Sequence, residues 1–205
     1  MLHKPEVPLA GFGHFTHHWF AKENCYAVKI KPGEFYVTRT NEAIVTTLGS
    51  CVSACITDPV AGVGGMNHFI LPVNSDNDDV TEQGSATRYG AFAMEQLINE
   101  ILKFGGKRER LVVKVTGGGQ MIPGMSDIGA KNIAFVRQFL AIEHMNILSD
   151  DTGGTHGRKV AYLPLQGRLL VKRLPALLNN KLYVAESQFQ QVINKSGLSG
   201  DVELF

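Results

Sequence analysis

Short apolar runs, separated by clusters of Gly, Pro, Asn and Asp, make up most of the chain and predict β-strands. Two longer stretches, 85–104 and 128–145, instead carry apolar residues at helical spacing and predict α-helices. A shorter helix is expected at 184–194. The expected strands span 26–30, 35–38, 43–47, 52–57, 63–71, 111–115, 147–149, 159–163 and 169–174.

The order of these elements indicates the fold class. Strands come first, two long helices lie among the later strands, and a hairpin follows at 159–174. This order predicts an α+β fold or a layered α/β sandwich with mixed, hairpin-rich sheets, rather than a parallel Rossmann sheet. Ser85 and Asp127 are expected to cap the two long helices, and Gly105-Gly106 to close the first.

The chain is expected to form one main domain with two flanking segments. Its 205 residues suffice for one domain with a substantial core. This domain is placed at 26–174, after an N-terminal extension at 1–25 and before a C-terminal helix and tail at 175–205. In the extension, His14 and His18 have the i, i+4 spacing of a helical metal site, but nearby glycines disfavour a helix. An aromatic, His-rich arm that lies against the domain or is partly disordered is preferred.

Composition and charge exclude several function classes. The 20 basic and 19 acidic residues nearly balance, so nothing favours a nucleic acid or an anionic membrane as partner. No apolar run approaches the roughly 20 residues of a membrane span, and residues 1–8 lack the layout of a signal peptide. Three cysteines, an odd number, indicate a reducing cytosol rather than a disulfide framework.

The most informative stretch is a predicted hairpin, formed by 52–57 and 63–71 around the turn Asp58-Pro59-Val60-Ala61. With a two-residue loop at 59–60, Cys51 faces His68, with their Cβ atoms about 5 Å apart. One extra turn residue or a bulge would break this match.

A neighbouring thiol and imidazole predict nucleophilic catalysis. An imidazolium lowers the pKa of the thiol and can later protonate a leaving amine, so we expect a Cys51 pKa below the usual value of about 8.5 and a raised His68 pKa. Gly49 and Ser50 let the chain turn before Cys51 and leave amide N–H groups free for an oxyanion. The alternative is a buried small cysteine and a satisfied core histidine, which is the commoner case for an arbitrary pair.

Metal and phosphate sites are the competing explanations for nearby motifs. On a strand, Cys51 and Cys55 share a face but lie about 13 Å apart, too far for one zinc ion. On a helix they could ligate a metal together with His68, but the β-branched residues around them favour a strand. The loop 117–119 is Gly-Gly-Gly, yet it lacks the lysine and the spacing of phosphate-binding loops. No metal and no cofactor are therefore expected, and the glycines predict a close-packed turn near the active site. The acidic stretch 73–84 predicts a surface loop at the rim of the site.

Several motifs together resemble the CheD family, the chemoreceptor glutamine deamidases of bacterial chemotaxis. The first are Leu48-Gly49-Ser50-Cys51-Val52, the Asp58-Pro59 turn, and the Gly-Met-Asn-His-Phe-Ile-Leu-Pro segment at 65–72. Further motifs follow in order at 88–90, 114–121, 127–132, 151–154 and 157–159, so the resemblance covers roughly 40–174. It implies an α/β sandwich, similar to deamidating bacterial toxins, with Cys and His in one cleft.

The resemblance also implies a reaction. Cys51 would attack the side-chain carboxamide of a glutamine, His68 would protonate the leaving ammonia, and water would hydrolyse the thioester to glutamate. Gly49, Ser50 and Asn67 are the expected oxyanion-binding or positioning residues.

A threonine shortly before the cysteine is the third catalytic member in the family. Counting back without gaps reaches Val45, so Thr46 is the candidate, with Thr47 as the alternative.

The implied substrate is the cytoplasmic helical bundle of chemoreceptors, with a CheC-type phosphatase as a further partner. Neither nucleic acid nor membrane insertion is expected, and the protein is placed in the cytoplasm. Two other functions stay open. One is a chemotaxis binding module that acts on a CheC-type phosphatase, and the other is a Cys-His peptidase or acyltransferase.

Overall fold

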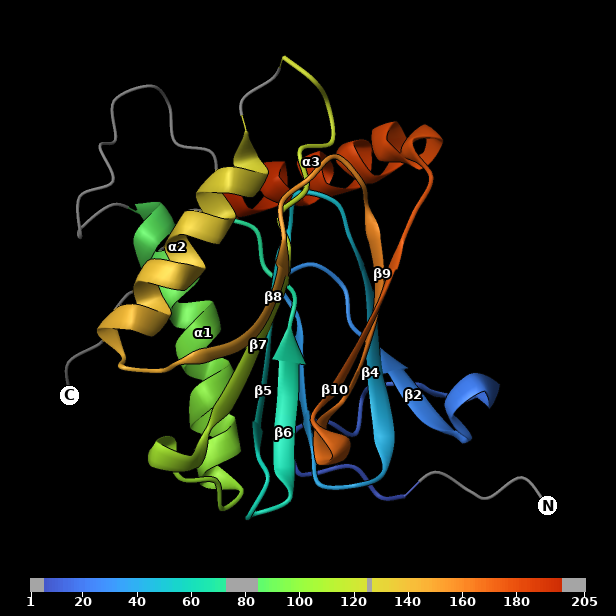
Figure 1. Ribbon diagram of the computed structural model, residues 1–205, viewed down its shortest axis with the longest axis vertical. Coiled ribbons are helices and arrows are strands. Elements are labelled where there is room, and N and C mark those ends of the chain that lie inside the picture. The colour runs from blue at the N-terminus through green and yellow to red at the C-terminus, as the bar shows by residue number, and fades with distance from the viewer. Residues whose placement is uncertain (1–5, 73–84, 125–126, 197–205) are drawn as a thin grey trace.

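A computed structural model describes residues 6–72, 85–124 and 127–196, which form two stacked β-sheets and three α-helices (Figure 1). The strands are β1 (His17–Phe20), β2 (Cys25–Lys29), β3 (Phe35–Thr38), β4 (Glu42–Leu48), β5 (Val52–Asp58), β6 (Val63–Asn67), β7 (Val112–Gly117), β8 (Ile147–Thr152), β9 (Arg158–Leu163) and β10 (Arg168–Arg173). The α-helices are α1 (Ser85–Lys103), α2 (Ile128–Ile142) and α3 (Asn179–Ser196), and single turns of 3₁₀-helix lie at 21–23, 108–110, 164–166 and 176–178.

Each sheet has five strands and mixes parallel with antiparallel pairs. The first sheet has the order β1-β2-β4-β9-β10, and the second has the order β3-β6-β5-β7-β8. Only the pairs β2–β4 and β7–β8 are parallel among the described strands. Helices α1 and α2 cover the outer face of the second sheet, while α3 lies across one end of the sandwich (Figure 1). The predicted α+β sandwich with mixed sheets is confirmed.

Strand β5 lies at the centre of the second sheet and is buried on both faces. All seven of its residues are buried, because one face meets the first sheet and the other meets α1 and α2. Val52 and Ile56 are fully buried in the main core cluster, as are Tyr36, Leu97 and Tyr162. The residues that directly precede β5 are therefore joined to a strand that is buried along its whole length.

The segment before residue 25, which was predicted to be an arm, supplies a strand and a buried side chain to the fold. Strand β1, which was not predicted, pairs antiparallel with β2, and Phe12 is only 5% exposed. His17 points inward and lies 3.0 Å from the carboxylate of Glu42. His18 is the next residue of the same strand, so it faces the opposite side and does not join His14 on a helix.

Most other elements agree with the prediction to within a few residues. Asp127 caps α2 by accepting a hydrogen bond from the N–H of Ala130. Strand β6 ends earlier than expected, at Asn67, and α3 begins five residues before the predicted start. The predicted loop at 73–84 and most of the C-terminal tail lie outside the described residues, as does the side chain of the predicted cap Ser85. Within the described residues no helix combines the length and the apolar character of a membrane span.

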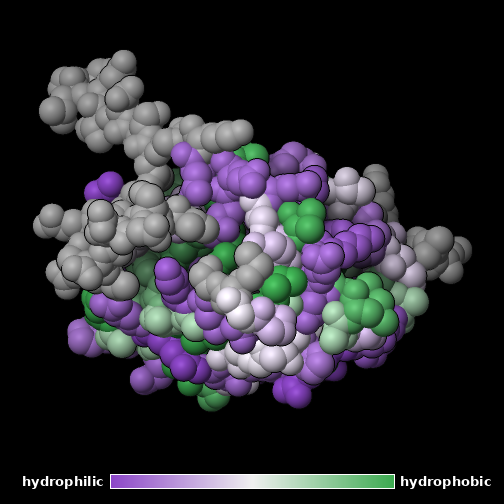
Figure 2. Space-filling model, turned by 90° about the horizontal axis from the view of Figure 1, so that it is seen from above, coloured by the Kyte–Doolittle hydropathy of each residue, from purple (hydrophilic) through white to green (hydrophobic). Residues whose placement is uncertain are grey.

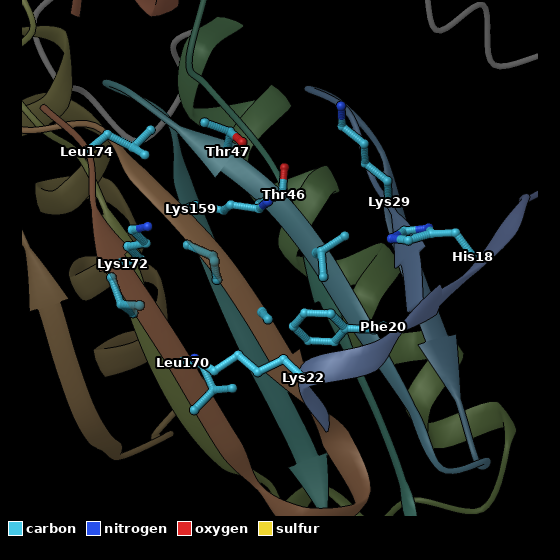
Figure 3. Close-up of a pocket in the computed structure, with 14 residues that line it drawn as sticks. His18, Phe20, Lys22, Lys29, Thr46, Thr47, Lys159, Leu170, Lys172 and Leu174 are labelled. Atoms are coloured by element: carbon cyan, nitrogen blue, oxygen red, sulfur yellow. The ribbon is translucent and has the colours of Figure 1, made fainter. Parts of the chain in front are cut away.

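The outer face of the first sheet holds a groove of about 510 Å³ (Figure 3). Lysines from four different strands or turns surround an apolar floor that includes Phe20 and Leu170. These lysines are Lys22, Lys29, Lys159 and Lys172. Cys51 and His68 do not line this groove, so it is separate from the predicted catalytic pair.

Candidate active site

The predicted hairpin forms, but its register differs from the prediction by two residues. Asp58 faces Val63, so the loop comprises the four residues 59–62 rather than two. The loop is longer because the Asp58 carboxylate accepts hydrogen bonds from two loop N–H groups, and a glycine with a φ of 61° closes the turn. The prediction that Cys51 lies directly opposite His68 is therefore wrong.

Cys51 and His68 nevertheless come together. A shift by two residues leaves the alternation of faces unchanged, so both side chains still point to the same side of the hairpin. Strand β6 ends just before His68, whose backbone N–H donates to the carbonyl of Glu34 instead. The sulfur of Cys51 and a ring nitrogen of His68 lie within 4.8 Å of each other. Both residues are buried, at 0% and 2% exposed.

Thr46 determines which nitrogen of His68 carries the proton. Its hydroxyl oxygen lies 2.9 Å from the carbonyl oxygen of Ile30 and 2.7 Å from Nδ1 of His68. A carbonyl oxygen can only accept, so Thr46 donates its single proton to Ile30 and must accept from Nδ1–H. The neutral ring therefore has an unprotonated Nε2, and this atom has no hydrogen-bond partner among the described residues.

The three residues at 49–51 form a cradle of backbone N–H groups, which we call the N–H cradle. Their carbonyl groups are held from behind: Gly119 N–H donates to Gly49, Gly118 N–H to Cys51, and the Asn132 amide to Ser50. The three N–H groups point away from these partners and bind a different acceptor. The Gly-Gly-Gly loop thus packs against the active site, as its lack of phosphate-binding features suggested.

The N–H cradle holds a carboxylate from α3. Oε1 of Glu186 accepts from the N–H of Gly49 at 2.7 Å and of Cys51 at 3.3 Å. Oε2 accepts from the N–H and the hydroxyl of Ser50, at 2.7 and 2.6 Å. Glu186 is 4% exposed, and one of its oxygens lies within 4.8 Å of both the Cys51 sulfur and the His68 ring.

Comparison with known proteins decides the family. A profile described as CheD chemotactic sensory transduction matches residues 70–173. A relative from Halorhodospira halophila, named probable chemoreceptor glutamine deamidase CheD, is 47% identical over 200 residues, which cover 96% of this chain and 93% of the relative. The chain belongs to the CheD family. Relatives of the same name from Hahella chejuensis and Janthinobacterium sp. are 43% and 50% identical, covering 98% and 87% of this chain and 95% and 89% of theirs.

Two other residues of the hairpin that the sequence singled out, Asn67 and Cys55, are held by other contacts. Asn67 accepts a hydrogen bond from the N–H of Ala54 and donates to the carbonyl of Ala93 on α1. Its amide therefore links the hairpin to α1, and its role as an oxyanion-binding or positioning residue stays a prediction. Cys55 is fully buried within β5, where it packs in the core.

Burial and Glu186 favour the neutral forms of the Cys51 thiol and the His68 imidazole. Desolvation, followed by the charge and the hydrogen bond of the Glu186 carboxylate, raises the pKa of the Cys51 thiol well above its usual value. Burial lowers the pKa of His68 to about 3. The expected low Cys51 pKa and raised His68 pKa are therefore wrong while α3 covers the pair.

Cys51, His68 and Glu186 also form the one group of potential metal ligands found among the described residues. Each oxygen of the carboxylate already accepts two hydrogen bonds, so its lone pairs are engaged by the N–H cradle and Ser50. This arrangement fits an oxyanion site beside a nucleophile better than a metal site. Cys55, which the sequence left open as a ligand, is not part of the group.

Sequence reasoning missed Asn132 and Glu186 as parts of the candidate site. Asn132 belongs to a CheD-like motif, but nothing in its spacing indicated a bond to Ser50. For Glu186 a signal existed: it lies at helical spacing between Leu182 and Phe189, so an acidic residue occupies the inward face of α3. A buried carboxylate needs several donors, and the N–H cradle supplies them.

Proposed function

We propose that this chain deamidates glutamine side chains of chemoreceptors, the reaction for which its relatives are named, with Cys51 as the nucleophile. The observation that carries the proposal is the chain of contacts from Thr46 through His68 to Cys51. It ends at backbone N–H groups that already bind a carboxylate. Nucleophile, base, orienting hydroxyl and oxyanion donors are thus all in one place.

The first half of the reaction forms a thioester. Nε2 of His68 takes the proton of the Cys51 thiol as the sulfur attacks the carboxamide carbon. The oxygen of the tetrahedral intermediate is stabilised by the N–H groups of residues 49–51. Collapse of the intermediate breaks the C–N bond, and the imidazolium of His68 gives its proton to the leaving ammonia.

The second half consumes one water. Neutral His68 takes a proton from water as the oxygen attacks the thioester carbon, and the released Cys51 sulfur is protonated again. Glutamate and free enzyme result. A cavity of about 110 Å³, lined by His68, Tyr89 and Phe92 among others, lies beside the imidazole. Since a water occupies about 30 Å³ in the liquid, the cavity has room for a few waters.

Surroundings and partners follow from the same proposal. The substrate is a glutamine in the cytoplasmic helical bundle of a chemoreceptor, and we place the enzyme in the cytoplasm. The three free cysteines Cys25, Cys51 and Cys55 support a reducing compartment. A CheC-type phosphatase is a proposed partner, supported by the family alone.

Intact-mass analysis of a receptor cytoplasmic fragment tests the activity. Incubation with the enzyme should add about one dalton per converted glutamine, because –NH₂ is replaced by –OH through the thioester. Fragments of the receptor would instead indicate a peptidase. The proposal would be contradicted if the receptor mass stayed unchanged after incubation with folded wild-type enzyme and also with a folded variant in which Glu186 is replaced.

A further inference from the structure

Glu186 occupies the position that the mechanism gives to the substrate. Its carboxylate is bound by the N–H cradle, beside the nucleophile. A receptor glutamine would need the same donors and the same access to Cys51, which is 0% exposed. Helix α3 and a substrate therefore cannot bind at the same time.

The chemistry of the occupant is that of the product. Glutamate differs from glutamine only in its terminal group, and deamidation turns one into the other. We infer that α3 covers the surface on which the substrate helix binds, and that Glu186 is held there as the product glutamate is held. We call this surface the α3-binding surface. The inference rests on the proposed function. It means that the α3-binding surface accepts a glutamine presented on an α-helix, and that α3 must leave before a receptor can react.

The α3-binding surface allows close approach of a helix. Leu182, Phe189 and Gln190 share the inward face of α3 with Glu186. A Cβ on Gly157 would lie 2.3 Å from the Leu182 side chain, and a Cβ on Gly33 would lie 2.5 Å from the Phe189 ring. Glycine at these two positions lets α3 lie close to the surface.

The contacts around Glu186 suggest what a substrate helix needs. An apolar residue four positions before the reacting residue corresponds to Leu182, and one three positions after it corresponds to Phe189. At the next position, the Gln190 amide donates to the carbonyl of Leu71 at 2.7 Å. We expect receptor glutamines with apolar neighbours at −4 and +3 to be preferred.

Helix α3 can leave without opening the core. Every fully buried apolar side chain in the described residues lies outside α3, and Phe189 and Ile193 only pack against the core from its edge. The outward face of α3 exposes Val184 and Val192, at 47% and 61%. Seen from this end, the molecule shows small hydrophobic patches separated by hydrophilic side chains (Figure 2). Undocking of α3 is thus a local event, separate from global unfolding.

The N–H cradle favours carboxylate over carboxamide in this pose. Both oxygens of Glu186 face hydrogen-bond donors, and the Ser50 N–H would meet the –NH₂ group of a glutamine bound in the same way. Glu186→Gln should therefore loosen α3 and, at the same time, place a substrate group beside Cys51.

Self-deamidation of Glu186→Gln is the decisive experiment. Digestion with trypsin gives a peptide of residues 182–195, in which tandem mass spectrometry resolves residue 186 from Gln188, Gln190 and Gln191. In the protein with Cys51, residue 186 should be recovered as glutamate, because one turnover per molecule suffices. In Cys51→Ala/Glu186→Gln it should stay glutamine, and the other three glutamines should stay unchanged in both proteins.

Access to Cys51 gives a second readout that does not depend on activity. Phe189→Asp removes an apolar contact of α3 and leaves the N–H cradle intact. Alkylation of Cys51 by iodoacetamide should become at least tenfold faster, with Cys25 and Cys55 as internal controls in the same digest. Gln188→Ala, an exposed change on the same helix, is the matched control and should alkylate like wild type.

The outcomes separate this inference from the proposed function. If residue 186 stays glutamine in an enzyme that deamidates receptors, α3 does not occupy the substrate position. Unchanged alkylation of Cys51 in folded Phe189→Asp would equally overturn the inference. If residue 186 is converted and alkylation rises while no receptor is deamidated, the inference holds and the receptor substrate is wrong.

Discussion

At the residue scale, one hydroxyl proton determines how His68 works. Thr46 gives its proton to a backbone carbonyl, so it can only accept from Nδ1–H, and Nε2 is left unprotonated as the proposed base. The proposed chemistry depends on this tautomer, because a protonated Nε2 could not take the proton of the thiol. We therefore propose that Thr46 positions His68 and takes no direct part in the chemistry.

Thr46→Val should keep the fold and lose activity. Valine has a similar volume but no acceptor, so Nδ1–H loses its partner and the ring loses its preferred tautomer. We expect the rate of receptor deamidation to fall roughly 10²-fold or more, measured by mass spectrometry under single-turnover conditions. Thr46→Ser should recover most of the rate and also the pH profile. Equal rates for Thr46→Val and wild type would contradict the assignment.

Cys51→Ala should abolish deamidation, whereas Cys55→Ala should cost little activity. Cys55 lies in the core of β5 and faces no reacting group, so its loss affects packing alone, by about 1 kcal/mol. Activity is measured on the receptor fragment and folding by circular dichroism. A Cys55→Ala protein that is folded and as inactive as Cys51→Ala would show that the nucleophile is wrongly assigned.

The buried imidazole should make stability depend on pH. His68 stays neutral in the folded protein down to a pKa of about 3, while the unfolded chain takes up a proton near the ordinary 6.5. Between these values the unfolded state binds more protons, so the free energy of unfolding falls as pH falls, by at most about 1.4 kcal/mol per pH unit. This contribution is fully present above pH 6.5.

Urea unfolding at pH 7 and pH 5 checks this dependence. Wild type should lose more stability over the interval than His68→Gln, which has no such proton to take up. Parallel losses in the two proteins would mean that His68 is already charged in the folded state.

At the scale of elements, the hairpin shows what a sequence can and cannot predict. The alternation of faces has a period of two, so an error of two residues in register still placed Cys51 and His68 on one side. The turn was predicted two residues too short, although the Asp58 carboxylate that shapes it bonds to N–H groups of the loop itself. What could not be predicted are the further contacts of Asp58 with Lys107 and Arg110, about fifty positions away. Helix caps such as Asp127 are local and were predictable. An acidic residue on the inward face of α3 was visible in the sequence, but the partners of Glu186 were not predictable, because they lie more than a hundred residues earlier.

Asp58 should be a large contributor to stability. Its carboxylate is fully buried and accepts from two turn N–H groups, from the N–H of Lys107 and from the side chain of Arg110. Burial raises its pKa, but these hydrogen bonds outweigh that effect and lower the pKa to about 2. Asp58→Ala should destabilise the protein by roughly 3 kcal/mol, because several buried donors lose their acceptor.

A matched change at an exposed ion pair gives the comparison. Asp150 pairs with Arg137 at the surface, and Asp150→Ala should cost less than about 1 kcal/mol. Both variants are measured by urea unfolding at neutral pH. Similar losses for the two would show that the turn is not held by Asp58.

At the scale of the whole molecule, both sheets and α3 meet at one end of the sandwich. Thr46 lies in β4 of the first sheet, Cys51 precedes β5 and His68 follows β6 of the second, and Glu186 lies in α3. Figure 1 shows α3 across the end of the two sheets. The sandwich was predictable from the order of the strands and helices, because each of these elements is indicated by the spacing of its own apolar residues. The stacking of its two sheets that brings Thr46 to His68 was not, because it depends on contacts between distant segments.

The short connection between β10 and α3 has a consequence for how the enzyme responds to dilution. Only residues 174–178 join the two elements, so Glu186 is present at its site at an effective concentration of roughly millimolar or more. Because α3 is part of the same chain, dilution does not separate it from the site. The fraction of molecules with α3 undocked should therefore be the same at nanomolar and micromolar enzyme. A receptor glutamine competes at its own local density, and its apparent dissociation constant is multiplied by the inverse of this undocked fraction. Deamidation should therefore proceed fastest where receptors are most crowded.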